Sequence, residues 1–233
     1  MKKTLLTAAI AVFMTLVSIP EARAQFGIYV GYQAARYTDN GKIDDKPFNG
    51  VRLELDYTWM FGKYFGTGIG AGYSFDTRDN GSYAFPGEVL ANFSTQEQYV
   101  YIPLKLKINL PISGDVAFEL SGGPSLSYAL AGSDTFDFTH GLDNPLSFTY
   151  DMYADRIESD DLPSYVIDVL NSSLEKSRYE RFGIDMTAGA GLRISKNVRI
   201  EGAMSWYMTN QLKKSAGGKL SRRLWTAGVS FLF

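Results

Sequence analysis

The segment YVYIPLKLKINLP, residues 99–111, decides the fold because its side chains alternate in character with a period of two. One set is aliphatic: Val100, Ile102, Leu104, Leu106, Ile108 and Leu110. The other set is Tyr101, Pro103, Lys105, Lys107 and Asn109. Alternation of this kind predicts a β-strand with one aliphatic face and one face that carries two lysines. The aliphatic face belongs either in the core of a soluble barrel or against lipid.

The composition excludes several classes of function. The chain has 233 residues, a formal net charge of −2, one histidine and no cysteine. This length suits one large β domain, and the near-neutral charge gives no indication of a nucleic-acid partner. A chain without cysteine has no disulfide or thiolate metal site, and one histidine excludes a His-rich metal centre. We therefore predict no metal, no cofactor and no nucleic acid.

The N-terminus, MKKTLLTAAIAVFMTLVSIPEARAQ, is typical of a secretory signal peptide. Lys2 and Lys3 precede an apolar stretch at 5–17, and Ala22 and Ala24 flank a small-residue cleavage site. We predict a signal peptide at 1–24, cleaved before Gln25, and a barrel domain at 25–233. A retained anchor is the alternative, but the apolar stretch is short for a membrane span.

Eight segments alternate, the deciding one among them, and are predicted strands: 25–37, 49–60, 64–76, 97–110, 115–130, 181–194, 198–209 and 220–233. Short connections at 61–63, 111–114 and 195–197 alternate with long ones at 38–48, 77–96, 131–180 and 210–219. All the short turns then fall at one end of an up-and-down meander. Outer-membrane barrels have this arrangement, with short periplasmic turns and an even number of strands.

The polar face of these strands mixes charges with glycine, which suits a narrow barrel interior. Gly66, Gly68, Gly70 and Gly72 have a spacing of two with no following helix, so they indicate such a face rather than a dinucleotide-binding loop. The predicted lumen charges are Arg52, Glu54, Asp56, Lys105, Lys107, Asp115, Glu119, Arg181, Asp185, Arg193, Arg199 and Glu201. Six positive and six negative charges cancel, which predicts an ion-paired filling rather than a pore; a narrow ion or proton path is the alternative.

Aromatic residues gather at both ends of the predicted strands. Those near the short turns are Trp59, Phe61, Phe65, Phe118 and Phe233. Those near the long loops are Tyr73, Phe75, Tyr128, Trp206 and Trp225. Two aromatic belts that flank an aliphatic band are typical of membrane–water interfaces.

Residues 25–233 resemble the small eight-stranded outer-membrane β-barrel proteins, in particular the PorT-like branch. The residues that carry the resemblance are YVYIPLKLKINLP, ELSGGPSLSYALAG, RFGIDMTAGAGLRISKNVRIEGAMSWY and LWTAGVSFLF. The resemblance implies a barrel in the outer membrane of a Gram-negative bacterium and, for some PorT-like proteins, a part in protein secretion. Phe231 and the terminal Phe233 resemble the signal that the barrel assembly machinery reads.

The long connection at 131–180 exceeds what a turn requires, and such loops are usually functional or disordered. Its second half, SDDLPSYVIDVLNSSLEKSR, predicts a helix in which Asp161 is the cap and Pro163 lies in the first turn. One stripe of this helix is apolar: Leu162, Tyr165, Val166, Val169, Leu170 and Leu174. We expect the stripe to act as a lid over the barrel mouth or to dock an envelope protein, and both alternatives stay open.

Two further groups of residues suggest chemistry at the outer end. His140, with Thr139 and Asp143 nearby, raises the alternative of an outer-leaflet lipid-modifying enzyme; a solvated loop histidine is the simpler interpretation. The second group is basic: Arg36, Lys213, Lys214, Lys219, Arg222 and Arg223. These residues either hold phosphates of outer-membrane lipid and lipopolysaccharide or are solvated loop charges.

The sequence thus predicts an all-β fold: an eight-stranded antiparallel up-and-down transmembrane β-barrel with a helix in one long outer loop. A soluble lipocalin-like carrier is the main structural alternative, because it inverts the two faces. Lumen charges and the terminal phenylalanine disfavour it. We expect a non-enzymatic envelope or secretion component with a closed lumen and no catalytic residues.

Overall fold

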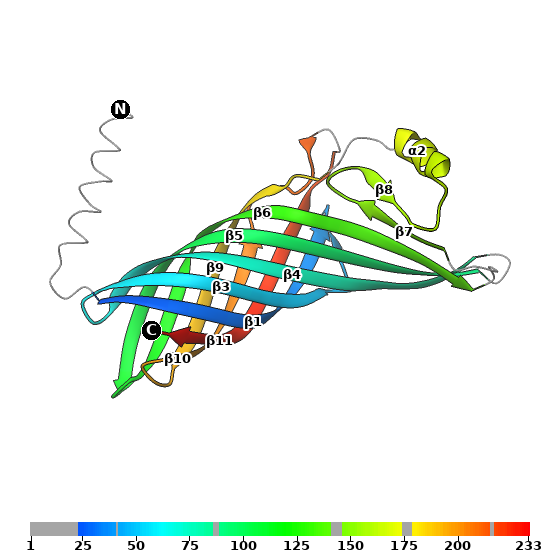
Figure 1. Cartoon of the computed structure of the whole chain (residues 1–233). Helices are drawn as coiled ribbons and strands as arrows, with labels where there is room; N and C mark the ends of the chain where they lie inside the picture. The colour runs from blue at the N-terminus through cyan, green and yellow to red at the C-terminus, as the bar shows by residue number, and fades with distance from the viewer. Residues whose placement is uncertain (1–22, 41, 86–88, 141–145, 174–178, 215–216) are drawn as a thin grey trace, which may run out of the picture.

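The computed structural model describes residues 23–40, 42–85, 89–140, 146–173, 179–214 and 217–233 (Figure 1). The eight long strands are β1 (Arg23–Asp39), β3 (Phe48–Phe61), β4 (Phe65–Phe85), β5 (Val89–Ser113), β6 (Val116–His140), β9 (Phe182–Arg193), β10 (Val198–Tyr207) and β11 (Leu220–Leu232). Shorter elements are β2 (Lys42–Ile43), β7 (Leu146–Asp151), β8 (Arg156–Glu158) and helix α2 (Ser164–Ser173). Nearly all of the predicted signal peptide lies outside the described residues.

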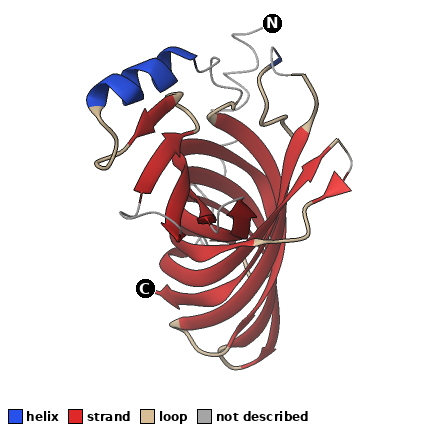
Figure 2. Ribbon diagram, turned by 90° about the vertical axis from the view of Figure 1, so that its right-hand side faces the viewer, coloured by secondary structure: helices blue, strands red, loops and turns tan. Residues whose placement is uncertain are grey.

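The eight long strands form one closed antiparallel ring (Figure 2). Around the ring the order is β1, β3, β4, β5, β6, β9, β10 and β11, so each long strand pairs with its neighbours in sequence. The ring closes where β1 pairs with β11, from Gly27 opposite Leu232 to Asp39 opposite Leu220. The predicted fold class, an eight-stranded up-and-down barrel, is confirmed.

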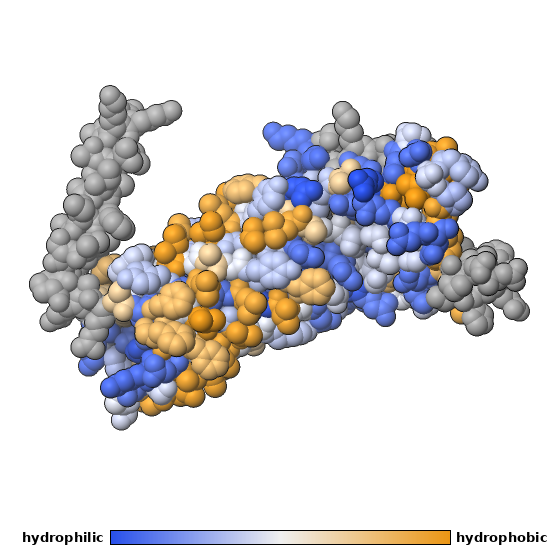
Figure 3. Space-filling view, in the orientation of Figure 1, coloured by the Kyte–Doolittle hydropathy of each residue, from blue (hydrophilic) through white to orange (hydrophobic). Residues whose placement is uncertain are grey.

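The aliphatic side chains of the deciding segment point outward, and its lysines point into the lumen. Leu106 is 71% exposed, whereas Lys107 is 5% exposed. Figure 3 shows an apolar surface over the half of the barrel nearer the short turns. This surface extends outward to Tyr32 on β1, Val51 on β3, Val100 on β5 and Trp206 on β10, and we take it as the membrane-spanning part.

Beyond the membrane-spanning part, three strands continue where the sequence predicted loops. The β4 strand reaches Phe85, β5 begins at Val89 and β6 reaches His140, so the predicted loops at 77–96 and 131–180 are wrong in part. These extensions form an outer arm, defined as residues 77–85, 89–97 and 131–140 together with β7 and β8. Figure 1 shows the arm projecting from one side of the barrel.

The alternation continues through the arm with its polarity reversed, which explains why loops were predicted there. Asn92 and Gln96 of β5 now lie on the outward face and are exposed, while Ala91 and Phe93 lie on the inward face. Water replaces lipid outside the arm, so its outward face is polar. Its inward face carries apolar residues together with a few polar ones, such as Glu97 and Asp134. A prediction that relies on outward aliphatic residues therefore ends each strand at the membrane boundary and misses its continuation in the arm.

Helix α2 forms as predicted within 159–178, but its cap differs from the expectation. The Asp161 carboxylate accepts a hydrogen bond from Ser147 N at 2.8 Å, so it fixes the preceding turn to β7. Ile167 N instead donates to the carbonyl of Pro163, which directly precedes the helix. Among the described residues no helix is long and apolar enough to cross a membrane.

Tight packing in the lumen predicts a severe effect of a single methyl group. A Cβ at Gly72 would lie 2.0 Å from Tyr101 Cζ. The Tyr101 ring cannot move easily, because its hydroxyl donates to Leu53 O at 2.9 Å and Arg52 Cζ lies 3.7 Å from the ring centroid. We expect Gly72→Ala to lower the free energy of unfolding in micelles by about 1–3 kcal/mol.

The matched control is Gly202→Ala, because a Cβ there meets its nearest atom, Thr226 O, at 3.3 Å. Guanidinium unfolding followed by tryptophan fluorescence measures both variants. Equal stability of the two variants would contradict the assigned packing.

Candidate functional site

The lower lumen is filled by ion pairs that join five strands. Arg199 on β10 lies at the centre, with its guanidinium 2.8 Å from Glu201, 3.1 Å from Glu119 and 3.7 Å from Asp56. Lys107 on β5 donates to Asp56 Oδ2 at 3.1 Å and to Thr58 Oγ1 at 2.6 Å. Because a buried charge costs several kcal/mol unless it is paired, these contacts compensate the charges that ring closure buries.

The same network extends to both sides of Arg199. Lys105 and Arg52 each form an ion pair with Glu54, and the distance from Arg52 to Glu54 is 3.5 Å. Arg193 on β9 lies 3.2 Å from Glu119. These side chains occupy the space across the ring, and the lumen of an eight-stranded barrel is only wide enough for such a filling.

Ten of the twelve predicted lumen charges lie inside the barrel, and two do not. Asp115 is exposed, because it lies in the turn between β5 and β6 where Gly114 has a φ of +55°. Arg181 precedes β9 at the outer rim, where its guanidinium donates to the carbonyls of Ala129 and Leu130. Both predictions failed for the same reason. The inward–outward alternation of a strand was counted through residues that lie outside the strands, where it does not apply.

A second buried cluster, in the upper lumen, was not predicted. Arg222 is 1% exposed and forms an ion pair with Asp76, while Glu97 Oε2 lies 4.0 Å from it. Gln33 Nε2 also donates to Asp76. The assignment of Arg222 to the basic outer rim is therefore wrong. Alternation along β11 contained the signal, since Arg222 shares the inward parity of Leu224.

The other predicted basic residues lie at the outer rim. Arg36 and Arg223 are exposed and directly opposite each other on β1 and β11. Lys214 and Lys219 are exposed, and Lys213 is half-buried. This arrangement leaves a pair of arginines just above the membrane-spanning surface.

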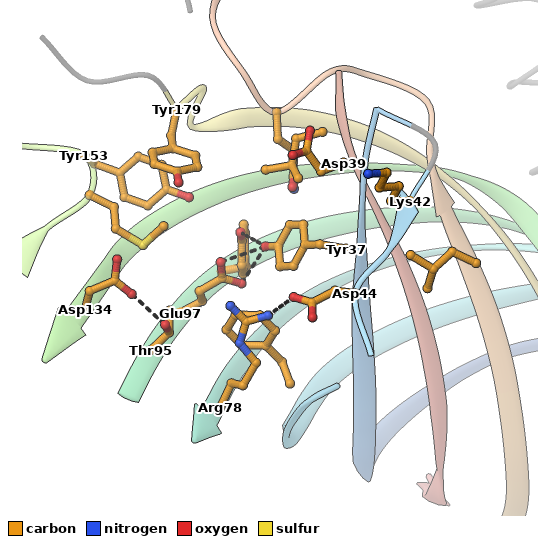
Figure 4. Close-up of a pocket in the computed structure, with 16 residues that line it drawn as sticks. Tyr37, Asp39, Lys42, Asp44, Arg78, Thr95, Glu97, Asp134, Tyr153 and Tyr179 are labelled. Carbon is orange, nitrogen blue, oxygen red and sulfur yellow. Dashed lines mark hydrogen bonds and ion pairs between the residues drawn. The ribbon is translucent and has the colours of Figure 1, made fainter. Parts of the chain in front are cut away.

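A cavity of about 340 Å³ lies at the outer mouth, and we call it the mouth cavity (Figure 4). Five aromatic rings line it: Tyr37, Phe48, Tyr99, Tyr153 and Tyr179. Six charged side chains line it as well: Asp39, Lys42, Asp44, Arg78, Glu97 and Asp134. The aromatic residues come from distant parts of the chain, so no local motif predicted this site.

Two carboxylates of the mouth cavity differ in their partners. Tyr37 donates its hydroxyl to Glu97, 2.7 Å from each carboxylate oxygen. Thr95 donates its hydroxyl to Asp134 Oδ1 at 2.6 Å. Burial raises the pKa of Asp134 above its usual range and raises the pKa of Tyr37 strongly. Both tyrosine and carboxyl groups therefore favour their neutral forms more than they do in water.

Helix α2 lies beside the ring rather than across its opening (Figure 2). Asn171 fixes it to β8, accepting from Ile157 N at 2.6 Å and donating to Ile157 O at 3.2 Å. Tyr165 is 69% exposed, Val169 62% and Leu170 38%. Leu162 and Val166 are half-buried, and Leu174 lies outside the described residues. Three of the five described residues of the predicted apolar stripe are thus exposed.

Other predicted residues have less defined surroundings. The backbone of His140 ends β6, but its side chain and that of Thr139 lie outside the described part, as does Asp143. In the described ranges no group of three or more His, Asp or Glu side chains is placed to hold a metal ion. Phe231 is 47% exposed and Phe233 70% exposed at the short-turn end of the last strand.

An aliphatic outer surface, an ion-paired lumen and a ring closed between the first and last strands define a membrane-spanning β-barrel. The chain belongs to the family of the outer membrane protein beta-barrel domain, whose model matches residues 6–233. The protein is therefore a barrel of the Gram-negative outer membrane. No curated protein matches the chain.

The chain is similar to several solved outer-membrane proteins. The attachment invasion locus protein Ail of Yersinia pestis is 16% identical with a TM-score of 0.43, covering 91% of this chain and 99% of Ail. Neisserial surface protein A is 10% identical with a TM-score of 0.42, covering 88% and 96% respectively. OprG of Pseudomonas aeruginosa is 11% identical with a TM-score of 0.38, covering 90% and 96%.

The lumen network predicts that removal of one cation destabilises the barrel without opening it. Lys107→Met leaves Asp56 buried without its nearest cation, so we expect a loss of about 3 kcal/mol in the free energy of unfolding. Conductance in planar bilayers should not change, because methionine fills the same space. The double variant with Asp56→Asn should recover part of the loss.

Lys63→Met is the control for this prediction, because Lys63 is exposed in the turn between β3 and β4. A new large conductance in Lys107→Met would show that the ion pairs obstruct a pore rather than fill a closed lumen.

Proposed function

We propose that this protein is a closed, non-enzymatic component of the outer envelope, similar to PorT-like proteins, that docks a secretion or surface protein at its outer end. The exposed apolar stripe of α2, with Tyr165 and Val169 more than half exposed, is the observation that carries this proposal. Exposed apolar groups on a small helix are costly in water, so they favour a partner that covers them.

The lumen supports a docking role over a transport role. Ion pairs around Arg199 cross the ring between β3, β5, β6, β9 and β10, and a diffusing solute would have to break them. Arg222, Asp76 and Gln33 close the lumen again at a higher level. A barrel filled at two levels offers its outer surface, not its interior, for function.

The attachment of α2 supports recognition by a partner groove. Ten residues of helix span about 15 Å, which is enough to present two turns to a groove. The face with Asn171 is fixed to β8, so the helix keeps its orientation while Tyr165 and Val169 point away. A helix held this way loses little conformational freedom when a partner binds.

Photo-crosslinking in intact cells tests the docking proposal directly. We expect a photo-reactive residue at Tyr165 or Val169 to capture one defined envelope protein, because both side chains are on the exposed stripe. Asn92, exposed on the polar outward face of the arm, is the matched control position and should capture no such partner. Adducts confined to the protein's own barrel would contradict docking and make α2 a lid.

Substitution of His140 tests whether the protein is an enzyme. We expect His140→Ala to leave the lipid A profile in mass spectrometry and the crosslink from Tyr165 unchanged. A lipid modification that disappears in His140→Ala while the barrel still folds would establish the outer-leaflet enzyme instead.

A further inference from the structure

The mouth cavity has the size and position of a ligand site. Its volume of about 340 Å³ lies in the range of small-molecule sites. Its walls come from β1 to β6 and β11, together with residues that follow β2, β7, α2 and β10. Arg222 and Asp76 fill the lumen below it, so a ligand enters from outside and does not pass through.

The aromatic lining favours a cation. The face of a tyrosine ring attracts an ammonium or guanidinium group within about 6 Å. The protein itself uses this attraction at the cavity floor, where Arg222 Cζ lies 4.5 Å from the Tyr99 ring centroid and 5.9 Å from that of Tyr37. Higher in the cavity, the ring centroids of Tyr153 and Tyr179 are 6.3 Å apart and the ring planes are inclined by 69°, an edge-to-face pair. The Tyr153 ring already attracts one cation in this way, because Arg181 Cζ lies 4.7 Å from its centroid.

The charge of the lining favours the same class of ligand. Four carboxylates, from Asp39, Asp44, Glu97 and Asp134, face two cations, from Lys42 and Arg78, which leaves two negative charges. Arg78 pairs with Asp44, and Glu97 has Tyr37 and Arg222 as partners. Asp134 takes part in none of the ion pairs between described residues, and its hydrogen-bond donor is the neutral hydroxyl of Thr95.

These features lie together on one side of the cavity. Figure 4 shows Asp134, Tyr153 and Tyr179 on the side opposite to Lys42 and Asp39. Burial raises the pKa of Asp134, because its carboxylate has lost water. The hydroxyl of Thr95 and the charge of Arg78, which forms its ion pair with Asp44, offset this effect only in part. A ligand cation at this position would form an ion pair with Asp134.

We propose that the mouth cavity binds a small organic cation, an ammonium or guanidinium compound with an apolar body, whose charge lies against Asp134. The apolar body packs against Tyr153 and Tyr179. This site is separate from the exposed stripe of α2, so the proposal does not depend on a docking partner.

Calorimetric titration of the folded protein in micelles with phenethylammonium and 2-phenylethanol tests the proposal. The two probes have nearly the same shape and differ in charge. We expect phenethylammonium to bind at least tenfold more tightly than the alcohol. Asp134→Asn keeps the hydrogen bond from Thr95. This variant should bind the ammonium about tenfold more weakly and the alcohol with unchanged affinity.

Asp137→Asn is the matched control, because Asp137 is three residues further along the same strand on the opposite face, where Ser147 donates to it at 2.6 Å. This variant should bind both probes as the unmodified protein does. Partition of the probes into micelles is common to all variants and cancels in the comparison. If Asp134→Asn fails to fold, Tyr153→Leu should weaken the ammonium about threefold more than the alcohol.

Equal affinity for ammonium and alcohol, or equal affinity of Asp134→Asn and Asp137→Asn for the ammonium, would overturn the proposal. So would the absence of binding by phenethylammonium up to about 10 mM.

Discussion

Every backbone N–H and C=O group inside a lipid bilayer must find its partner within the protein, and the pairing of β1 with β11 meets that demand by closing the sheet. Eight strands close into a ring whose interior is just wide enough for side chains to fill. The polar side chains that face inward are therefore buried, and their charges must be compensated. Arg199, with three carboxylates around it, is the clearest consequence. A closed backbone thus leads to a filled lumen, and the recognition that we propose lies at the outer end for this reason.

The reversal of polarity along β5 shows how the surroundings decide which face of a strand is apolar. Between Leu110 and Val100 the outward residues are aliphatic, and between Gln96 and Asn92 they are polar. The backbone pairing with β6 continues across this boundary, with an irregularity at Gln98 and Tyr99. Inward-facing Phe93 and Phe136 consequently meet above the barrel, at a centroid distance of 4.9 Å. One continuous strand therefore serves as a membrane wall in its lower half and as part of a water-soluble structure in its upper half.

Most of the barrel was predictable from sequence because a period of two is strict inside a strand. Lys105 and Lys107 were placed correctly by counting from their aliphatic neighbours. The prediction failed where the count passed through a turn, as at Asp115, or beyond a strand end, as at Arg181. The prediction also failed at the start of the arm, where the outward face of the strands changes from aliphatic to polar. The mouth cavity was beyond reach for another reason: Tyr37, Tyr99 and Tyr179 come together only through ring closure, which no local pattern contains.

The length of the arm determines how far the protein extends above the membrane surface. From Val100 to Leu90, β5 continues for ten residues above the membrane-spanning part, which is about 33 Å along the strand. With a tilt of about 40°, this corresponds to an elevation of roughly 25 Å above the apolar surface. Such an elevation exceeds the thickness of a lipid headgroup layer, which is about 5–8 Å per leaflet. The partner that we propose can therefore approach this end of the protein without entering the headgroup layer.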